Sequence, residues 1–347
     1  MNPKQRLSFY WWPVLMLAVT TGCTGVPKQT APLVRYEYQR PEMGVPFRIV
    51  LYSDKQATAE RAAEAAFQRV QQLNDIMSDY DPDSELSRLS RSSGQGHEVR
   101  VTDDLWFVLN RAQALAERSE GAFDVTVGPY VILWRRARRQ HELPDPTRLA
   151  QAGQSVGYQH VRLIPERQSV ELLVPNMRLD LGGIGKGYAL DEALKVLRGQ
   201  GIERAMVEGG GDLEVSEPPP GKQGWRIELS SVDATNAPPA RFLLLKNRAI
   251  STSGDLYQRL EINGKRYSHI VDPRTGIGLT NHCVVNVIAK DGITSDSTTK
   301  VISVLGAKRG FQIIKQTSGV VARIMTDIGD KIEVSESKGF AGYYDAN

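Results

Sequence analysis

The sequence predicts an α+β fold in which mixed sheets carry flanking helices. Strand-like and helix-like segments alternate irregularly, without the regular strand–helix–strand order of a doubly wound parallel sheet. No repeat of solenoid length occurs. The chain has 347 residues, of which 41% are hydrophobic, so it is long enough to bury a sizeable core in one large domain or in two closely packed ones.

Helices are predicted where apolar residues recur at helical spacing. The clearest case is residues 57–78, where the recurring apolar residues are Ala62, Ala66, Val70, Leu73 and Met77. A second helix is predicted over 103–121, and a short third one over 293–306, closed by Gly306.

Strands are predicted where short apolar or alternating runs lie between turn residues. These runs are residues 43–52, 160–165, 169–175, 225–232, 240–252, 264–272 and 282–290. The last run contains Cys283, whose apolar neighbours indicate a buried structural thiol rather than a nucleophile.

The N-terminus has the features of a secretory signal. Lys4 and Arg6 precede an apolar run at residues 7–19, which is short for a membrane-spanning helix. We expect residues 1–22 to be removed on export.

The end of this segment resembles the lipobox at which bacterial lipoproteins are cleaved and lipidated. Gly22 precedes Cys23, although Thr20 occupies a position where an aliphatic residue is usual. We therefore expect Cys23 to carry lipid and residues 23–40 to form a lipidated N-terminus and tether, with the folded domain spanning 41–345. The alternatives are ordinary secretion with a chance cysteine, or a retained N-terminal anchor.

The overall charge gives no reason to expect a nucleic-acid partner. The 43 basic and 40 acidic residues nearly cancel, leaving a formal charge of +3. The basic run of Arg135, Arg136, Arg138 and Arg139 lacks interleaved aromatic residues, so we interpret it as a solvated helix face or lid rather than a nucleic-acid patch.

A glycine-rich segment, RLDLGGIGKGYALDEALKVL at residues 178–197, joins a strand-like run to an amphipathic helix. It matches neither common nucleotide fingerprint, because the first glycine of a Walker loop would fall at Asp180 and the third glycine of a dinucleotide loop at Tyr188. Glycines before a helix still favour an anion site, to which Lys186 would add charge. The alternative is a tight turn with a solvent-exposed lysine.

Three further segments carry polar residues suited to a ligand site. Asp212 follows three glycines, residues 251–254 offer a small hydrogen-bonding loop, and His269 lies three residues before Asp272. A histidine at that position is a candidate base near neutral pH, or else a buried histidine satisfied by a neighbour.

Taken together and in order, the motifs resemble the ApbE family of flavin transferases, the FAD:protein FMN transferases, over roughly residues 40–340. The segments that carry the resemblance are MGVPF, MSDYDPDSELSRL, GAFDVTVGP, DLGGIGKGYALD, GGGDL, STSGD, HIVDPRTG and TSD. The resemblance implies an ApbE-like, T-fold-related domain.

The resemblance also implies an activity, which is transfer of FMN from FAD to a Ser or Thr hydroxyl of a partner protein with release of AMP. It implies that Mg²⁺ lies between the Gly183 carbonyl and Asp296, with hydroxyl and phosphate oxygens completing its shell, for which Thr299 is the candidate that we name. It also implies that His269 and Asp296 are catalytic, with His269 as the base. The implied FAD site consists of Met43, Tyr80, Ala122, Phe123, Asp124, Asp180, Lys186 and the backbone around Ile270. The expected partner is a flavin-accepting membrane or periplasmic electron-transfer protein. The expected location is the periplasmic side of a bacterial membrane, through the lipid anchor.

The sequence departs from the family pattern at two positions. Lys300 stands where a metal-binding threonine is usual, and Glu208 stands where Asn or Ser is frequent. A charged lysine has no lone pair to give a metal, so either Thr298 or Thr299 supplies a ligand, or the Lys300 ammonium replaces part of the metal's charge. Two alternative functions stay open, namely a non-catalytic FAD-binding lipoprotein and a pyrophosphatase that splits FAD into FMN and AMP.

Overall fold

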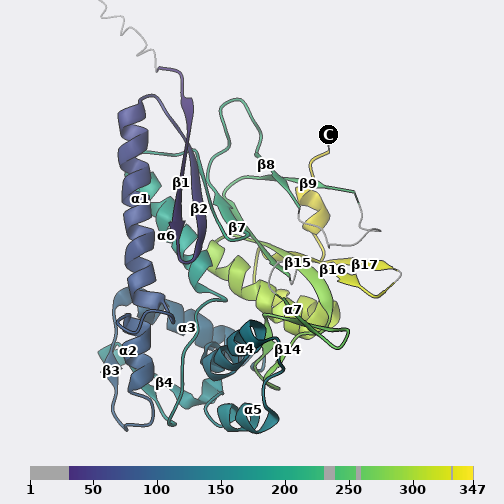
Figure 1. The fold of residues 1–347 in the computed structure, drawn as a ribbon. Coiled ribbons are helices and arrows are strands. Elements are labelled where there is room, and N and C mark those ends of the chain that lie inside the picture. Colours follow the sequence, from purple (N-terminus) through teal and green to yellow (C-terminus); the bar gives the residue numbers. More distant parts are fainter. Residues whose placement is uncertain (1–30, 230–238, 255–258, 330, 347) are drawn as a thin grey trace, which may run out of the picture. The chain divides into compact units, whose positions relative to one another are not determined.

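An eight-stranded antiparallel sheet forms the centre of the fold (Figure 1). The computed structural model describes residues 31–229, 239–254, 259–329 and 331–346. The strand order is β1-β2-β6-β7-β10-β15-β16-β17. The bounds are β1 Val34–Glu42, β2 Val45–Ser53, β6 Ala205–Gly209, β7 Asp212–Val215, β10 Arg248–Gly254, β15 His282–Ala289, β16 Val321–Asp327 and β17 Ile332–Glu336.

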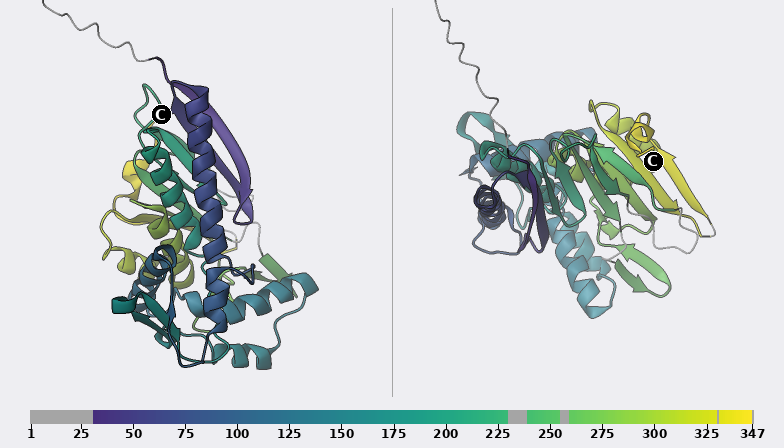
Figure 2. Two further views of the ribbon diagram at one scale, coloured as in Figure 1. Left: turned by 90° about the vertical axis from the view of Figure 1, so that its left-hand side faces the viewer. Right: turned by 90° about the horizontal axis from the view of Figure 1, so that it is seen from above.

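Three helices pack on one face of this sheet, as Figure 2 shows from the side. They are α1 (Gln56–Met77), α6 (Gly185–Gly199) and α7 (Gly292–Ile314). α1 presents a stripe of small and apolar side chains, which allows its backbone to approach α6 closely. The buried residues of that stripe are Ala59, Ala62, Ala63, Ala66, Phe67, Val70, Leu73 and Met77.

The opposite face of the sheet is covered by a two-stranded sheet and a short 3₁₀ helix. These elements are β8 (Trp225–Glu228), β9 (Phe242–Leu245) and η4 (Phe340–Tyr343). Trp225 and Phe340 are buried against Val50 and Ile250 of the central sheet. The central strands are therefore buried on both faces, which explains why residues 282–290 read as a nearly continuous apolar run.

A second group of elements lies below the central sheet in the view of Figure 1. It includes a small sheet in the order β3-β5-β4 and the pairs β11-β12 and β13-β14. Trp134 stacks near Tyr267, with ring centroids 5.3 Å apart. The bounds are α2 Glu85–Arg91, β3 Val99–Arg100, α3 Asp103–Arg118, η1 Val125–Val127, α4 Gly128–Gln140, α5 Pro146–Gly153, η2 Tyr158–His160, β4 Val161–Ile164, η3 Pro165–Arg167, β5 Ser169–Leu172, β11 Arg259–Ile262, β12 Lys265–Ser268, β13 Val271–Asp272 and β14 Ile277–Gly278.

The α+β class and the principal elements are confirmed. The helices predicted over 57–78 and 103–121 are α1 and α3, and each predicted strand run contains at least one strand. The helix predicted to close at Gly306 does end at that residue, whose backbone is non-helical (φ 71°, ψ 178°), but a second helical segment within α7 follows it to Ile314 and is not predicted.

Two other predictions need correction. The tether was expected to extend to residue 40, but β1 begins at Val34 and pairs with β2 throughout its length. The basic run is predicted to be solvated, and Arg136 and Arg139 are exposed, but the Arg135 side chain is only 19% exposed.

Cys283 is buried, as predicted. The expected signal peptide at 1–22 and the lipidated Cys23 lie outside the described residues. Among the residues that the structure describes, no helix is both long and apolar enough to cross a membrane.

Candidate functional site

The glycine loop lies where α6 crosses the start of α7. Gly187 and Gly292 are the contact point, because a Cβ on Gly187 would clash with the Gly292 carbonyl and come within 2.8 Å of Asp296 Cβ. Asp191 of α6 accepts hydrogen bonds from the backbone N–H groups of Gly292 and Ile293, the latter at 3.0 Å. Glycine at 187 thus permits the close crossing, and Asp191 fixes the start of α7.

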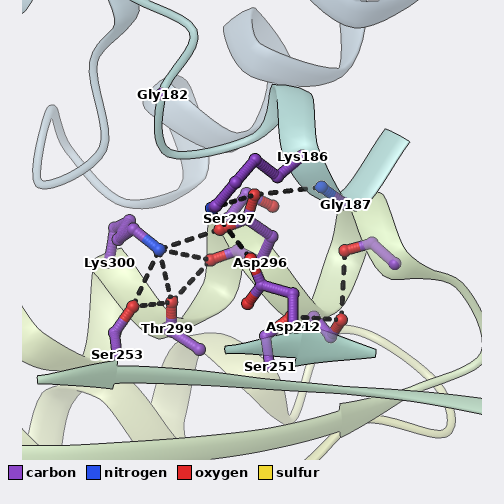
Figure 3. Close-up of polar contacts among 12 residues, drawn as sticks. Gly182, Lys186, Gly187, Asp212, Ser251, Ser253, Asp296, Ser297, Thr299 and Lys300 are labelled. Carbon is purple, nitrogen blue, oxygen red and sulfur yellow. Dashed lines mark hydrogen bonds and ion pairs between the residues drawn. The ribbon is translucent and has the colours of Figure 1, made fainter. Parts of the chain in front are cut away.

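This crossing brings together two lysines and two aspartates, here called the lysine–aspartate cluster: Lys186, Asp212, Asp296 and Lys300 (Figure 3). Lys186 Nζ lies 2.8 Å from Asp212 Oδ2 and 3.7 Å from Asp296 Oδ2. Asp296 Oδ2 also accepts a hydrogen bond from Gly187 N at 3.1 Å. Asp296 is fully buried, and Asp212 is 1% exposed.

Burial and charge act in opposite directions on these groups. Burial alone would raise the pKa of Asp296, but Lys186 and Lys300 together hold the pKa below its ordinary value. For Asp212, burial and the neighbouring Asp296 raise the pKa despite the two lysines. Burial opposes the charged form of Lys186, yet Asp212 and Asp296 raise its pKa, so the ammonium stays charged.

Lys300 occupies the place where the sequence predicted a metal. Its Nζ donates to Asp296 Oδ1 at 2.8 Å, to Ser253 Oγ at 2.7 Å and to Thr299 Oγ1 at 3.0 Å (Figure 3). Its stem lies against Gly183, where an added Cβ would be 3.1 Å from Lys300 Cγ.

The predicted metal site therefore does not fit a divalent cation. Of the expected ligands, Asp296 and Thr299 already bind the Lys300 ammonium, and the lysine stem fills the space beside Gly183. Within the described part of the chain, no group of three or more His, Cys, Asp or Glu side chains is arranged to hold a metal.

Hydroxyl groups of β10 line the floor of this cluster. The segment predicted as a hydrogen-bonding loop is in fact strand, and its side chains meet α7. Ser251 Oγ lies 2.8 Å from Ser295 Oγ, and Ser253 Oγ lies 2.7 Å from Thr299 Oγ1. The alternation of a strand explains why these two serines share a face.

A second group of charges, here called the arginine cluster, consists of Arg135 with Asp79, Asp180 and Tyr80. Arg135 forms ion pairs with both carboxylates, at 3.2 Å from Asp180 Oδ2. The Arg135 guanidinium lies over the Tyr80 ring, 4.1 Å from its centroid. Burial and Asp79 raise the pKa of Asp180, while Arg135 opposes that rise.

The arginine cluster borders an open cavity of about 660 Å³. Its lining includes Tyr80, Ser87, Arg91, Met177 and Arg178. Tyr80 is 76% exposed, so its ring is available for stacking by a planar ligand.

The remaining predicted FAD-site residues fall in several surroundings. Phe123 is buried beside Gly183, close to the lysine–aspartate cluster. Ala122 is also buried. Asp124 caps η1, accepting from Thr126 N at 2.8 Å and Thr126 Oγ1 at 2.7 Å, so it shapes the turn. Burial raises the pKa of Asp124.

Met43 lies in the turn between β1 and β2 at φ 50°, half-buried against the main core. That turn is near the lysine–aspartate cluster, because a Cβ on Gly210 would touch both Val45 (3.1 Å) and Lys186 Cε (3.3 Å). His269 and Ile270 are half-exposed between β12 and β13, where Ile270 N donates to Ser268 Oγ at 3.1 Å. Their functional roles stay predictions.

Sequence reasoning missed Asp79 and Arg135 of the arginine cluster, and also Asp191, which fixes the start of α7. Arg135 was assigned to a solvated face, and Asp191 was treated only as part of an amphipathic helix. Glu208, noted as a departure from the family, forms an ion pair with Arg48 on the neighbouring strand, with 3.0 Å between Glu208 Oε2 and Arg48 Nε. No sequence pattern marks such pairs, because their partners lie far apart along the chain.

Comparison with known proteins identifies the family of this chain. The ApbE family model matches residues 43–325. An FAD:protein FMN transferase of Klebsiella pneumoniae is 30% identical over 298 residues, covering 86% of this chain and 91% of that protein. One from Vibrio cholerae is 30% identical over 311 residues, covering 88% and 92%.

Two solved structures share the fold. The flavin transferase ApbE from Vibrio cholerae is 29% identical, with a TM-score of 0.81 over 90% of this chain and all of that one. The ApbE protein from Thermotoga maritima is 28% identical, with a TM-score of 0.80 over the same shares. The chain therefore belongs to the ApbE family.

Proposed function

We propose that this chain transfers FMN from FAD to a Ser or Thr hydroxyl of an acceptor protein. In this reaction the acceptor oxygen bonds to the phosphorus of the FMN half, the diphosphate bond breaks, and AMP leaves. The observation that carries the proposal is the glycine loop at the start of α6, with Lys186 beside it, in a chain of the ApbE family. The Lys186 ammonium and the positive end of the α6 helix dipole suit a diphosphate.

In the proposed reaction, different residues bind the diphosphate, contact the rings of FAD, accept the proton and position the lysines. The loop and Lys186 bind the diphosphate and offset charge that develops on it. Tyr80 offers an exposed aromatic ring to a planar part of FAD, and the binding site is completed by Met43, Ala122, Phe123, Asp124, Asp180 and Ile270. His269 accepts the proton of the attacking hydroxyl, and Asp296 positions the two lysines through its carboxylate.

The Mg²⁺ dependence that the family resemblance implies is not part of this proposal. The expected ligands Asp296 and Thr299 bind Lys300 instead. The proposed transfer reaction therefore relies on side chains and backbone groups of this chain.

The proposal extends to the location of the protein. Export, lipidation of Cys23 and a periplasmic position on a bacterial membrane rest on the N-terminal sequence. A lipid-anchored transferase would meet flavin-accepting membrane or periplasmic electron-transfer proteins, which we propose as its partners.

The direct test is covalent flavin labelling. The full chain, purified in detergent, is incubated with FAD and with membrane and periplasmic fractions of a strain that lacks its gene. We expect flavin fluorescence on a denatured protein band, an FMN adduct on Ser or Thr by mass spectrometry, and AMP release. No adduct in any fraction, with or without Mg²⁺, would contradict transfer. AMP release without an acceptor would indicate a pyrophosphatase, and FAD binding without AMP a non-catalytic FAD-binding lipoprotein.

The role of His269 is tested by His269→Ala, with His97→Ala as control because His97 is an exposed histidine elsewhere on the chain. We expect His269→Ala to lose transfer by roughly a hundredfold or more while retaining FAD affinity, since general-base catalysis contributes about that much. Normal transfer by this variant would remove His269 from its role.

A further inference from the structure

Lys300 lies in the N-terminal half of α7. Oxygen atoms from α7 and from β10 surround its side chain. It lies one helical turn after Asp296, and its side chain is 16% exposed. An ammonium has three N–H donors, and here three close oxygen acceptors surround it: the Asp296 carboxylate and the hydroxyls of Ser253 and Thr299 (Figure 3). The lysine is therefore held in place rather than pointing freely into solvent.

The acceptors around Lys300 are of the kind that a hard cation prefers. Carboxylate and hydroxyl oxygens are typical ligands of Mg²⁺. A divalent cation that bound the same oxygens would have to displace the ammonium or lie beside its positive charge, which Coulomb repulsion opposes. The stem of Lys300 also packs against Gly183, so the side chain fills the space as well as the coordination positions.

The local charge is already balanced without a metal. Lys186 and Lys300 face Asp212 and Asp296 inside the lysine–aspartate cluster. Asp296 is fully buried and ion-paired with both lysines, so its charge is compensated by residues of the chain itself. Loss of Lys300 would leave an Asp296 oxygen and two hydroxyl groups free to bind another cation.

We propose that Lys300 is a built-in cation and that this flavin site binds no divalent metal. The inference rests on the proposed function, since it concerns the site where the FAD diphosphate binds. Lys300 supplies a fixed positive charge beside the glycine loop, and FAD binding and FMN transfer proceed in the presence of a chelator. Lys300 acts through Asp296 and by its charge, so it is a positioning residue.

Metal binding is measured directly, without reference to turnover. The full chain in detergent, saturated with FAD, is titrated with Mn²⁺ while free Mn²⁺ is followed by electron paramagnetic resonance. FAD alone serves as the blank. We expect the wild-type chain to bind no more Mn²⁺ than this blank. Stoichiometric binding of one Mn²⁺ per chain, competed by Mg²⁺, would overturn the proposal.

Two variants test whether Lys300 itself prevents Mn²⁺ from binding. Lys300→Thr is expected to gain one Mn²⁺ site, at least about tenfold tighter than wild type, because an oxygen ligand replaces a repelling charge. Lys308→Thr is the matched control, since Lys308 is an exposed lysine farther along the same helix. It should behave as wild type. The wild-type titration decides the proposal by itself, so the conclusion does not depend on the folding of Lys300→Thr.

Transfer assays on the same samples separate this inference from the proposed function. FMN transfer at equal rates in EDTA and in Mg²⁺ supports both. Transfer that requires Mg²⁺ overturns the inference and keeps the function. Absence of transfer in every condition counts against the function, while the Mn²⁺ titration still decides whether the site binds metal.

Discussion

The lysine–aspartate cluster and the arginine cluster use the same kinds of charge in different surroundings. In the first, two carboxylates and two ammonium groups are enclosed at a helix crossing, and Asp296 is fully buried. In the second, one guanidinium pairs with two carboxylates that are 11% and 9% exposed, and only Tyr80 of this cluster lines the open cavity. The lysine–aspartate cluster thus has two cations for two carboxylates, whereas the arginine cluster depends on a single arginine.

This difference predicts how each region responds to change. A buried ion pair that loses one partner leaves an uncompensated charge in a poorly solvated position, and the cost is smaller where the remaining carboxylates are partly exposed, as Asp79 and Asp180 are. We therefore expect the largest losses of stability in the lysine–aspartate cluster.

The strongest test of that contrast is Asp296→Asn. The substitution leaves Lys186 and Lys300 sharing one remaining carboxylate, so we expect the free energy of unfolding to fall by about 3–5 kcal/mol. Urea denaturation measures the loss, with Asp54→Asn, an exposed aspartate, as control. A loss below about 1 kcal/mol, typical of an exposed ion pair, would mean that the cluster is not enclosed as described.

The helix crossing is tested by Gly187→Ala. The new methyl group would clash with the Gly292 carbonyl, so α6 and α7 must separate, and we expect a loss of about 1–3 kcal/mol together with loss of transfer. Gly199→Ala is the matched control, because it lies on the same helix with open space around it. That control should be neutral or gain up to about 1 kcal/mol. Equal effects of the two substitutions would argue against a tight crossing.

A smaller effect is expected for Arg135→Met in the arginine cluster. Asp79 and Asp180 would lose their shared cation, at an expected cost of about 1–2 kcal/mol at pH 7. Asp180 has a raised pKa in the folded chain, so the folded state takes up its proton first and the deficit should shrink as the pH falls. Thermal unfolding at pH 7 and at pH 5 checks the sign. A deficit that grows toward acid pH would contradict this account.

At pH 7, the smallest effect is expected at Glu214 of β7. Burial and Asp191 raise the pKa of Glu214 to about 10, so its side chain is protonated in the folded chain at pH 7. The unfolded chain ionises near the ordinary value, so wild-type stability should fall as the pH rises from about 5 to about 10.

Glu214→Gln removes this dependence, and we expect a gain of about 1 kcal/mol at pH 7 that increases with pH. Urea denaturation at pH 6 and pH 9 measures it, with the exposed Glu228→Gln as control. A loss of stability that is independent of pH would show that the Glu214 carboxyl is ionised in the folded chain.

Some elements of the fold can be predicted from the sequence, and others cannot. The periodicity of residues 57–78 predicts α1 because its buried face recurs at helical spacing. β1 was assigned to a tether because it is an edge strand whose residues are mostly exposed or half-exposed, which gives a polar sequence. The second helical segment of α7, after Gly306, is not predicted because it depends on the burial of Ile314 in the core, a tertiary contact without a local signal.

In the functional site, too, some features can be predicted from the sequence and others cannot. The glycine loop and the departure at Lys300 are visible in the sequence, because motifs keep their spacing. The pairing of Arg135 with Asp180 is not, since 45 residues separate them along the chain. The contact between Lys300 and Ser253, 47 residues apart, likewise exists only in the folded structure.

The most direct test of the whole account is a crystal structure of the chain with FAD, grown with Mg²⁺ present. The account predicts the diphosphate at the glycine loop beside Lys186, with the Lys300 ammonium still bound to Asp296 and no metal between Asp296 and Gly183. A diphosphate bound elsewhere, or a Mg²⁺ ion on Asp296 with Lys300 displaced, would contradict it.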